Sequence, residues 1–194
     1  MVHIRISDLE KYAHEFHVPI MLKDGIDFLT DYIKKNKIRN ILEIGCAIGY
    51  SSIKMALVDS DIHITTIERD KDMYEQAIQN IEAFNLSDRI DVIFDDALNV
   101  NISGIYDLIF IDAAKSQYIK FFEKFKKNLN KNGVIITDNL DFHGLVKDCT
   151  NCSRNTKQLV NKIKKYIEFL KNNKEFDTEF LSIGDGISIS ELKS

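Results

Sequence analysis

Three side chains with metal-binding oxygen atoms follow two apolar runs of this chain. The run Leu108–Ile111 leads into Asp112. The run Val134–Thr137 leads into Asp138 and Asn139. Such runs are typical of strands buried on both faces of a parallel sheet, and ligands of these sheets bind at the carboxyl ends of the strands. We therefore expect the three side chains to share one crevice, where two carboxylates and an amide suit a hard cation such as Mg²⁺.

A loop after the first expected strand has the composition of an anion-binding turn. Gly45 and Gly49 let the backbone approach a ligand, and the helix that follows presents free N–H groups. A dinucleotide fingerprint has a further, middle glycine that admits the pyrophosphate, and Ala47 stands at that place here. A cofactor that carries a carboxylate instead of a pyrophosphate would tolerate this alanine.

Acidic residues end the next two expected strands. Glu68 follows the second strand, where an acid can accept hydrogen bonds from ribose hydroxyls. The third strand ends at Asp95, Asp96 and Ala97, where an aspartate could meet the amino edge of adenine. Ribose, adenine and an amino-acid carboxylate together describe S-adenosylmethionine (SAM). Glu68 taken alone could equally be a surface acid.

Strand and helix patterns alternate along the chain, which predicts an α/β fold with a mostly parallel, Rossmann-like sheet and helices on both faces. Helices are expected over residues 7–16, 25–35, 50–58, 70–84, 116–129 and 154–170, and strands over 40–44, 62–67, 90–94, 105–111, 133–137, 177–183 and 187–191. The tight turn Gly184-Asp185-Gly186 makes the last two strands an antiparallel hairpin. Ser7 and Glu10 have the spacing of a capping box. Residues 139–153 are an expected loop over the crevice.

Length and composition indicate one globular domain. A chain of 194 residues with 44% hydrophobic and 29% charged residues can bury a full core. We expect a single domain over residues 1–194, with N-terminal helices in 1–36 and the Rossmann-like core in 37–194. No apolar stretch approaches the ~20 residues that a membrane helix needs. The start Met1–Arg5 lacks the apolar core of a signal peptide, so we expect a cytoplasmic protein without a membrane partner.

The three cysteines give no disulfide framework by their number. Cys149 and Cys152 form a Cys-x-x-Cys pair, but a zinc site needs about four ligands and only His143 lies nearby. No strand leads directly into the pair, as one does in thioredoxin-like motifs. We expect a loop with two ordinary thiols.

Two stretches of the chain are strongly basic although the net charge is −4. Residues 154–174 hold seven basic residues and one acid, and residues 115–131 hold six lysines and one acid. They could form a patch that attracts phosphates. Composition alone favours the plainer interpretation of two solvated helix faces.

With these residues in place, the chain resembles class I SAM-dependent methyltransferases, and more narrowly the metal-dependent catechol/caffeoyl-CoA O-methyltransferase family. The matching stretches span nearly the whole chain: ILEIGCAIGYSS (41–52), TTIERD (65–70), YDLIFIDAAKSQY (106–118), GVIITDN (133–139) and GDGISIS (184–190). Within that family, YAHEFHVPIM (12–21) and KQLVNKIKKYIEFL (157–170) resemble the bacterial TrmR-type tRNA 5-hydroxyuridine methyltransferases.

The resemblance implies a set of site residues and a homodimer. The SAM-binding residues would be Met21, Glu43, Gly45, Gly49, Ser51, Glu68, Asp96, Ala97 and Asp112. The ligands of Mg²⁺ would be Asp112, Asp138 and Asn139, and Lys115 takes the place of the catalytic lysine. The chain departs from the family pattern in a short N-terminus, in Asp95 where glycine is common, in Ser182 where proline is common, and in the unmatched loop 147–153. These departures leave the identity of the methyl acceptor open.

The expected reaction is methyl transfer from SAM to an acceptor oxygen that Mg²⁺ activates and orients. Lys115 would act as general base beside Asp112, since a partly desolvated lysine near a cation loses its proton more readily. Without the resemblance, the plainer interpretation of Lys115 as a surface lysine would be favoured. A catechol and a 5-hydroxyuracil both offer two adjacent oxygens, so the same site could take either.

We expect the acceptor to be 5-hydroxyuridine at the tRNA wobble position, which would become 5-methoxyuridine, with the tRNA anticodon loop as partner. The alternative is a small phenolic substrate of catechol or caffeoyl-CoA type. A nicotinamide-dependent oxidoreductase is disfavoured by the incomplete glycine pattern. A non-catalytic SAM- or RNA-binding protein is disfavoured by the intact set Asp112, Lys115, Asp138 and Asn139.

Overall fold

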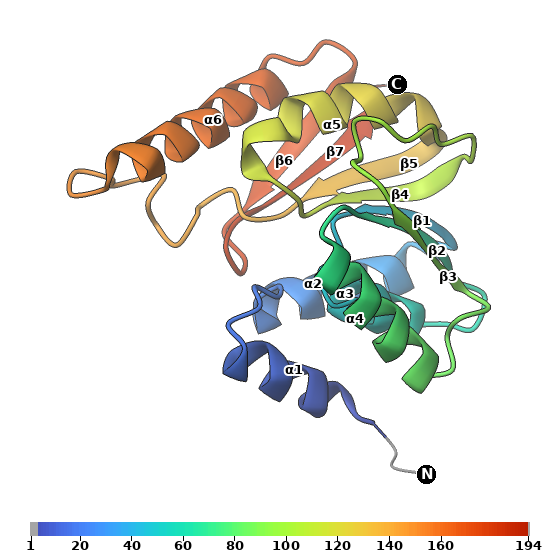
Figure 1. Ribbon diagram of the computed structural model, residues 1–194. Coiled ribbons are helices and arrows are strands. Elements are labelled where there is room, and N and C mark those ends of the chain that lie inside the picture. Colours follow the sequence, from blue (N-terminus) through green and yellow to red (C-terminus); the bar gives the residue numbers. More distant parts are fainter. Residues whose placement is uncertain (1–3, 194) are drawn as a thin grey trace.

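A mixed sheet of seven strands, in the order β3-β2-β1-β4-β5-β7-β6, forms the middle layer of the computed structural model over the described residues 4–193 (Figure 1). The strands are β1 (Asn40–Ile44), β2 (His63–Glu68), β3 (Ile90–Phe94), β4 (Tyr106–Ile111), β5 (Leu129–Thr137), β6 (Phe176–Leu181) and β7 (Ile187–Leu192). Strands β1 to β5 pair in parallel, while β7 runs antiparallel to both β5 and β6. This confirms the predicted mostly parallel sheet with an antiparallel C-terminal hairpin. Met1–His3, part of the segment used above to judge a signal peptide, lie outside the described residues.

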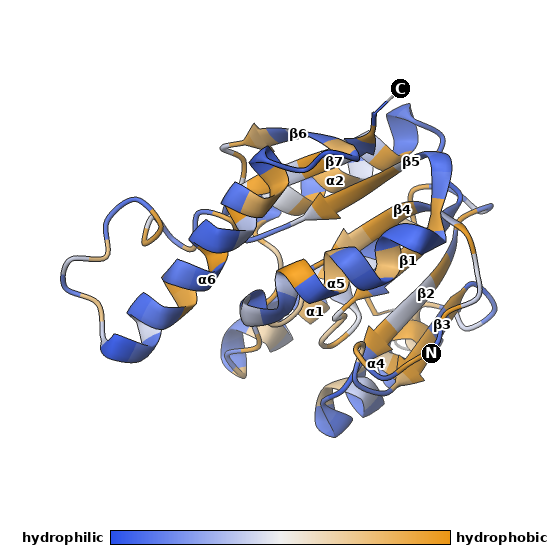
Figure 2. Cartoon of the chain, turned by 90° about the horizontal axis from the view of Figure 1, so that it is seen from above, coloured by the Kyte–Doolittle hydropathy of each residue, from blue (hydrophilic) through white to orange (hydrophobic). Residues whose placement is uncertain are grey.

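Helices cover the two faces of the sheet in two groups. They are α1 (Ile6–Glu15), α2 (Lys23–Lys35), α3 (Tyr50–Ala56), α4 (Lys71–Ala83), α5 (Tyr118–Phe125) and α6 (Arg154–Lys171), with short 3-10 turns η1 (Lys115–Gln117) and η2 (Lys126–Asn128) on either side of α5. Helices α1 to α4 pack on one face, and α5 and α6 pack on the other (Figure 1). Figure 2 shows the resulting alternation of apolar and polar residues along α5 and α6. No helix within residues 4–193 is long and apolar enough to cross a bilayer.

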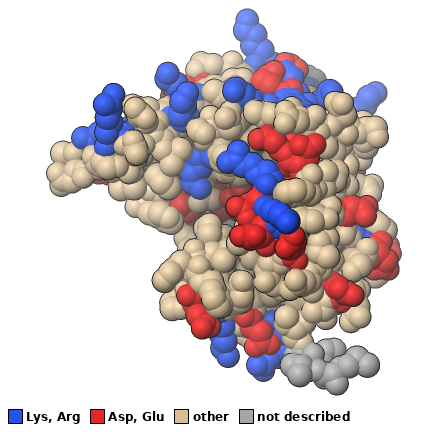
Figure 3. All heavy atoms as spheres, in the orientation of Figure 1, with Lys and Arg blue, Asp and Glu red and all other residues tan. Residues whose placement is uncertain are grey.

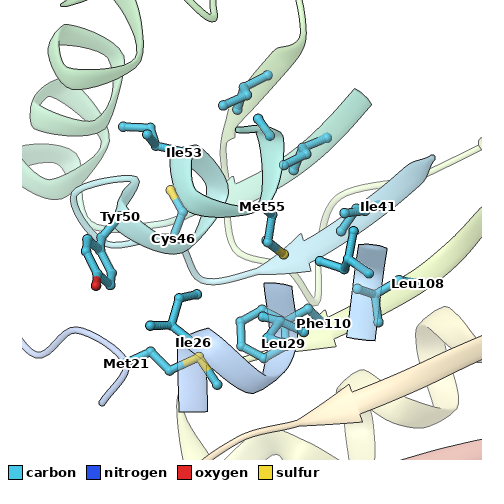
Figure 4. Close-up of a cluster of buried hydrophobic side chains, with 14 of the residues drawn as sticks. Met21, Ile26, Leu29, Ile41, Cys46, Tyr50, Ile53, Met55, Leu108 and Phe110 are labelled. Carbon is cyan, nitrogen blue, oxygen red and sulfur yellow. The ribbon is translucent and has the colours of Figure 1, made fainter. Parts of the chain in front are cut away.

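Alternation along β4 divides its side chains between two hydrophobic cores. Leu108 and Phe110 belong to the core on the side of α1 to α4, part of which Figure 4 shows. Ile109 and Ile111 belong to the core on the side of α5 and α6. All four side chains are fully buried. This strand is therefore covered on both faces, as its continuous apolar run predicts.

The order of the strands reverses between β1 and β4, which are parallel neighbours in the sheet. After β1 the chain enters α3 on one face, and after β4 it enters η1 and α5 on the other. The two connections diverge and leave a crevice at the carboxyl ends of these strands. The expected site residues after β1 and β4 therefore face each other across this crevice.

Several element boundaries differ from the sequence-based prediction: α2 begins two residues earlier, β5 begins four residues earlier, and β6 ends two residues earlier. Helix α1 begins at Ile6, and Asp8 accepts a hydrogen bond from the backbone N–H of Arg5 at 2.9 Å, so the predicted Ser7 capping box is wrong. Glu10 instead accepts a hydrogen bond from the Tyr50 hydroxyl at 2.9 Å. The helix predicted over 116–129 ends at Phe125, because residues 126–128 form η2 before β5 begins.

The expectation of two free thiols in the loop before α6 is also wrong. Cys149 and Cys152 form a disulfide, with their Cα atoms 5.1 Å apart. Asp148 accepts hydrogen bonds from the backbone N–H and the hydroxyl of Thr150 at 3.0 and 2.7 Å, which folds the segment into a tight turn. A cysteine count cannot show that this turn brings the two sulfur atoms together. Cys46 is buried and free.

Candidate active site

A cleft of about 290 Å³ lies at the carboxyl ends of β1 to β4. Most of the predicted site residues are on its wall: Met21, Gly45, Ser51, Glu68, Asp96, Ala97, Asp112, Lys115 and Asn139. Glu43, Gly49 and Asp138 are not among the residues that line it. The structure therefore brings together predicted site residues from six segments of the chain. Three further predicted site residues do not reach the wall of the cleft.

Gly45 lies where the carboxyl ends of β1 and β4 touch. Its backbone φ is +87°, and a Cβ atom added there would be 2.7 Å from the backbone oxygen of Asp112. Only glycine combines this dihedral angle with so close an approach. Gly49, with φ of +81°, precedes the first residue of α3 and so sets the turn from loop to helix. The two glycines thus shape the loop, and only Gly45 also lines the cleft.

Glu43 is fully buried beneath the loop. Its carboxylate accepts hydrogen bonds from the hydroxyls of Ser51, at 2.5 Å, and of Ser52. Burial raises the pKa of Glu43 to about 7, although the hydrogen bonds from the serines oppose this rise. Since Ser51 is on the cleft wall and Glu43 is not, the structure gives Glu43 the position of a support for Ser51 rather than of a ligand contact.

The carboxylate of Glu68 accepts hydrogen bonds from backbone N–H groups of two segments, the loop after β1 and the residues that follow Glu68. One oxygen accepts a hydrogen bond from the N–H of Ala47 at 2.9 Å, and the other accepts bonds from the N–H groups of Arg69 and Asp70 at 2.8 Å each. Ala47 has φ of +46°, a conformation that costs a non-glycine residue about 1–2 kcal/mol. The bond to Glu68 helps hold Ala47 in this conformation. A carboxylate fixed in this way can accept hydrogen bonds from a diol without reorganisation.

Arg69 and Asp96 form an ion pair at the rim of the cleft, with 3.5 Å between the guanidinium and the carboxylate. The other Asp96 oxygen accepts a hydrogen bond from the N–H of Leu98 at 2.8 Å. Sequence reasoning missed Arg69, because nothing in its local pattern marks an exposed arginine as a cleft residue. Its place on the wall depends on the neighbouring ends of β2 and β3.

Asp112, Asp138 and Asn139 meet at the other end of the cleft. The Asn139 amide donates hydrogen bonds to Asp112 at 2.9 Å and to Asp138 at 3.0 Å. Burial raises the pKa of Asp112 to about 6 and that of Asp138 to about 7. The charge of Asp112 adds to the rise for Asp138. The half-buried carboxylate of Asp112 and the buried one of Asp138 are thus bridged by a single neutral amide.

This group of side chains fits a divalent cation. Within the described residues, Asp138 Oδ1 is buried without a hydrogen-bond partner. No cluster of three or more His, Cys, Asp and Glu side chains arranged for a metal occurs in residues 4–193. The oxygen atoms that a cation could meet here belong to two carboxylates and to the amide of Asn139. Oxygen donors of this kind match Mg²⁺, which usually keeps several waters as further ligands. A cation there would offset the repulsion between the two carboxylates.

Asp185 is a further acidic residue of this region that sequence reasoning missed. It lies in the turn between β6 and β7, is only 5% exposed, and accepts a hydrogen bond from the backbone N–H of His143. Its negative charge contributes to the raised pKa of both Asp112 and Asp138. The sequence marked Asp185 only as a turn residue. Its approach to the cleft depends on loop 139–153, where Asp141 donates its N–H to the Asp185 carbonyl at 2.7 Å.

Lys115 lies in η1, between the cleft and the loop that follows Asn139. Its ammonium group is 5.6 Å from the centre of the Phe142 ring, within the range of a cation–π contact. Its positive charge opposes the rise in the pKa of Asp112. Tyr118, three residues on, donates a hydrogen bond from its hydroxyl to the carbonyl of Asp138 at 3.0 Å. The turn after β4 therefore contacts the loop above it, and the start of α5 contacts the backbone of Asp138.

Comparison with known proteins identifies the family. A model of the O-methyltransferase family matches residues 3–193. This chain belongs to the O-methyltransferase family. The Staphylococcus aureus protein named "putative caffeoyl-CoA O-methyltransferase" is 42% identical, with a TM-score of 0.92 over 98% of this chain and 93% of that one.

Two further relatives agree with this assignment. The O-methyltransferase from Bacillus cereus, solved in complex with SAH (S-adenosylhomocysteine), is 27% identical, with a TM-score of 0.83 over 97% of this chain and 90% of that one. Caffeoyl-CoA O-methyltransferase from Populus kitakamiensis is 27% identical over 196 residues, 96% of this chain and 83% of its own length. The protein is a SAM-dependent O-methyltransferase of the caffeoyl-CoA O-methyltransferase type.

Proposed function

We propose that this O-methyltransferase depends on a divalent cation and methylates 5-hydroxyuridine at the wobble position of tRNA. The observation that carries the cation dependence is the pair of carboxylates of Asp112, which is half-buried, and Asp138, which is buried, bridged by Asn139 beside the proposed cofactor cleft. The tRNA acceptor is supported by the resemblance of residues 12–21 and 157–170 to the TrmR-type enzymes and by the basic composition of α6.

The residues at one end of the cleft would bind SAM, and those at the other end would bind the cation. Glu68 and Asp96 lie where they can accept hydrogen bonds from the ribose and adenine of SAM. Asp112, Asp138 and Asn139 would hold the cation, most simply Mg²⁺. When bound, the cation supplies positive charge that favours loss of the acceptor's proton and fixes the acceptor's orientation.

Lys115 would receive the acceptor's proton at its Nζ atom, and its position on the same cleft wall as Asp112 supports this role. The ring of Phe142 lies next to this ammonium group on the loop side. Transfer of the methyl group is a displacement in which the acceptor oxygen must lie in line with the methyl carbon and sulfur. Holding both reactants in one cleft should therefore supply much of the rate enhancement.

A small phenol is the second candidate for the acceptor. The observation that favours it is the naming of the Populus and Staphylococcus relatives as caffeoyl-CoA O-methyltransferases. A catechol offers the same pair of adjacent oxygens as 5-hydroxyuracil. The proposed cation site would accept either, so the acceptor has to be decided by experiment.

A methyl-transfer assay with labelled SAM tests both parts of this proposal. Hydroxyuridine-bearing tRNA and a catechol are offered separately, each with Mg²⁺ or with a chelator. We expect labelling of the tRNA with Mg²⁺, loss of labelling with chelator, and a steep fall in tRNA labelling as salt increases. Turnover that survives the chelator would overturn the cation dependence. Labelling of the catechol alone would overturn the tRNA acceptor.

The variant Asp138→Asn separates the cation site from the cofactor site, because Asp138 does not line the cleft. It keeps the shape of the side chain and removes one charge of the pair. We expect activity to fall on the order of 100-fold or more, with SAH affinity unchanged. The matched control is Asp141→Asn, which removes a carboxylate paired with Lys147 on the surface of the same loop. Equal activity of the two variants would contradict the metal assignment.

A further inference from the structure

One face of α6 carries exposed cations that have no carboxylate partner. We call Arg154, Lys157, Lys164 and Lys165 the cationic stripe, since these positions fall on one side of a helix with 3.6 residues per turn. In the described part of the chain, the only ion pair made by α6 joins Lys171 to Glu168, at 3.4 Å. Glu168 is also the only acid of this helix. The stripe is therefore a concentration of unpaired positive charge on a protein whose net charge is −4.

The opposite face of α6 fixes the stripe relative to the active site. Val160, Ile163, Tyr166 and Leu170 are buried against the sheet. The hydroxyls of Tyr166 and Thr137 form a hydrogen bond of 2.8 Å, and Thr137 directly precedes the candidate cation ligand Asp138. A ligand held on the stripe would thus be held in a fixed relation to the carboxylate pair.

A shallow groove runs beside the stripe and has no carboxylate in its wall. It is lined by Cys149, Thr150, Lys157, Val160, Asn161 and Lys164. The disulfide between Cys149 and Cys152 closes the turn that forms one rim. Ammonium, hydroxyl and amide groups can all donate hydrogen bonds to phosphate and sugar oxygens. Figure 3 shows Lys and Arg atoms over α6, whereas Asp and Glu atoms gather near the middle of the molecule.

The dimensions and polarity of this surface fit a nucleic-acid backbone better than a membrane. Positions 154 to 165 span about 16 Å along the helix axis, enough to meet several phosphates in succession. A membrane-surface helix would present large apolar side chains beside its cations. None of the exposed large hydrophobic side chains among residues 4–193 lies on α6.

We propose that the cationic stripe and its groove bind the sugar–phosphate backbone of the substrate RNA, while the target base enters the cleft at β1 and β4. This inference rests on the proposed function, because that function supplies RNA as the substrate. It adds the surface that binds the RNA outside the catalytic cleft. Contacts of this kind set affinity and register and carry no base specificity.

The test compares two double variants that remove the same charge. Lys157→Gln with Lys164→Gln alters the stripe, and Lys34→Gln with Lys35→Gln alters the exposed end of α2, which packs on the other face of the sheet. Binding of fluorescently labelled tRNA is followed by anisotropy over a range of KCl concentrations. For the stripe variant we expect the slope of log K against log salt to fall by about 1.4–1.8, and affinity near physiological salt to fall about tenfold. The α2 variant should behave as wild type, and both should keep the wild-type melting temperature and SAH affinity.

Turnover separates failure of this inference from failure of the proposed acceptor. In one outcome, wild type binds tRNA and the stripe variant does not, although neither methylates hydroxyuridine-bearing tRNA. This result would support RNA binding by the cationic stripe and would overturn hydroxyuridine as the methyl acceptor. Methylation of that tRNA with the same KM by wild type and stripe variant would support hydroxyuridine as the acceptor. It would overturn RNA binding by the cationic stripe. Methylation of the free hydroxyuridine nucleoside should be equal in both proteins. Binding of wild type to anionic phospholipid vesicles with no binding to tRNA would also overturn the stripe.

Discussion

The buried carboxylates are the residues on which this site depends. Asp138 and Asp185 are buried beside the half-buried Asp112, and Glu43 is buried below the neighbouring loop. Each of these groups loses hydration on folding, and the pKa values of Asp112, Asp138 and Glu43 are raised as a result. Perturbed carboxylates in a cleft are typical of functional sites. Keeping these carboxylates together therefore lowers the free energy of unfolding at neutral pH.

Glu43→Gln should make the stability of the protein less dependent on pH. The folded-state pKa of Glu43 is raised from 4.5 to about 7, so its contribution is fully present below pH 4.5 and is lost as the pH rises through 7. Glutamine keeps a similar shape and does not ionise. The difference in unfolding free energy between variant and wild type should shift in favour of the variant by up to ~3 kcal/mol between pH 4 and pH 8. Urea unfolding at these two pH values measures the shift, and parallel pH profiles would contradict it.

The loops at the carboxyl ends of the strands bring these residues together. The loop after β1 passes so close to the end of β4 that Gly45 meets the backbone of Asp112. The loop after β5 pairs with the turn between β6 and β7, through the N–H of Leu140 and the carbonyl of Gly186 at 2.9 Å. The antiparallel hairpin thus has a function beyond extending the sheet, since it positions the loop that covers Lys115.

Gly45→Ala should disturb the cleft far more than the same change at Gly144. Both glycines have positive φ, +87° and +79°, so alanine is strained at each by about 1–2 kcal/mol. A Cβ at position 45 also meets the Asp112 backbone at 2.7 Å, whereas at position 144 nothing lies within 4 Å. We expect a loss of at least ~3 kcal/mol and of SAH binding for Gly45→Ala, and only the strain for Gly144→Ala. Thermal unfolding and isothermal titration with SAH would show this difference, and equal effects would refute the close contact.

The disulfide in the loop before α6 is open to a direct count. Protein purified without reductant and denatured should react with one equivalent of a thiol reagent, at Cys46, and with three after reduction. Replacing Cys149 and Cys152 together by serine should lower stability by about 2 kcal/mol at most, because the bond closes a very short loop. Three reactive thiols before reduction would show that the bond is absent from the purified protein.

At the scale of the whole molecule, the proposed cofactor cleft and the proposed RNA surface lie on different elements. The cleft is closed on one side by Pro19, Ile20 and Met21, which connect α1 to α2, and on the other by the strand-end loops. The cationic stripe lies on α6, on the opposite face of the sheet from α1 and α2. Binding of cofactor and binding of RNA should therefore leave separate signatures.

Amide hydrogen exchange can show whether SAH binds at the cleft alone or also affects α6. SAH should slow amide exchange in residues 20–21 and 45–47, because both segments line the cleft, and should leave residues 154–165 unchanged. Saturating SAH should also stabilise the fold, by about 2.7 kcal/mol at a concentration 100 times its Kd. Protection of α6 by SAH alone would contradict the separation of the two surfaces.

The sequence alone determined the order and type of the elements and the part of the site that lies at strand ends. Periodicity reports whether a segment is covered on one face or two, and a parallel sheet gathers its carboxyl ends at one edge. Asp112, Glu68 and Asp96 could be assigned to one cleft for that reason, and the matching motifs indicated the family. Element ends were less accurate, as at α1 and η2, because hydrogen bonds of single side chains decide them.

Tertiary structure alone decided which residues from distant segments meet. It placed Asp185 beside Asp112 and Asp138, Glu43 beneath Ser51, and Arg69 against Asp96. It also joined Cys149 to Cys152 through the shape of one turn. Local sequence patterns carry no information on these contacts, since each depends on how loops fold back once the sheet and both helix layers have packed. The strand-end carboxylates were thus predictable, and the surroundings that set their charge were not.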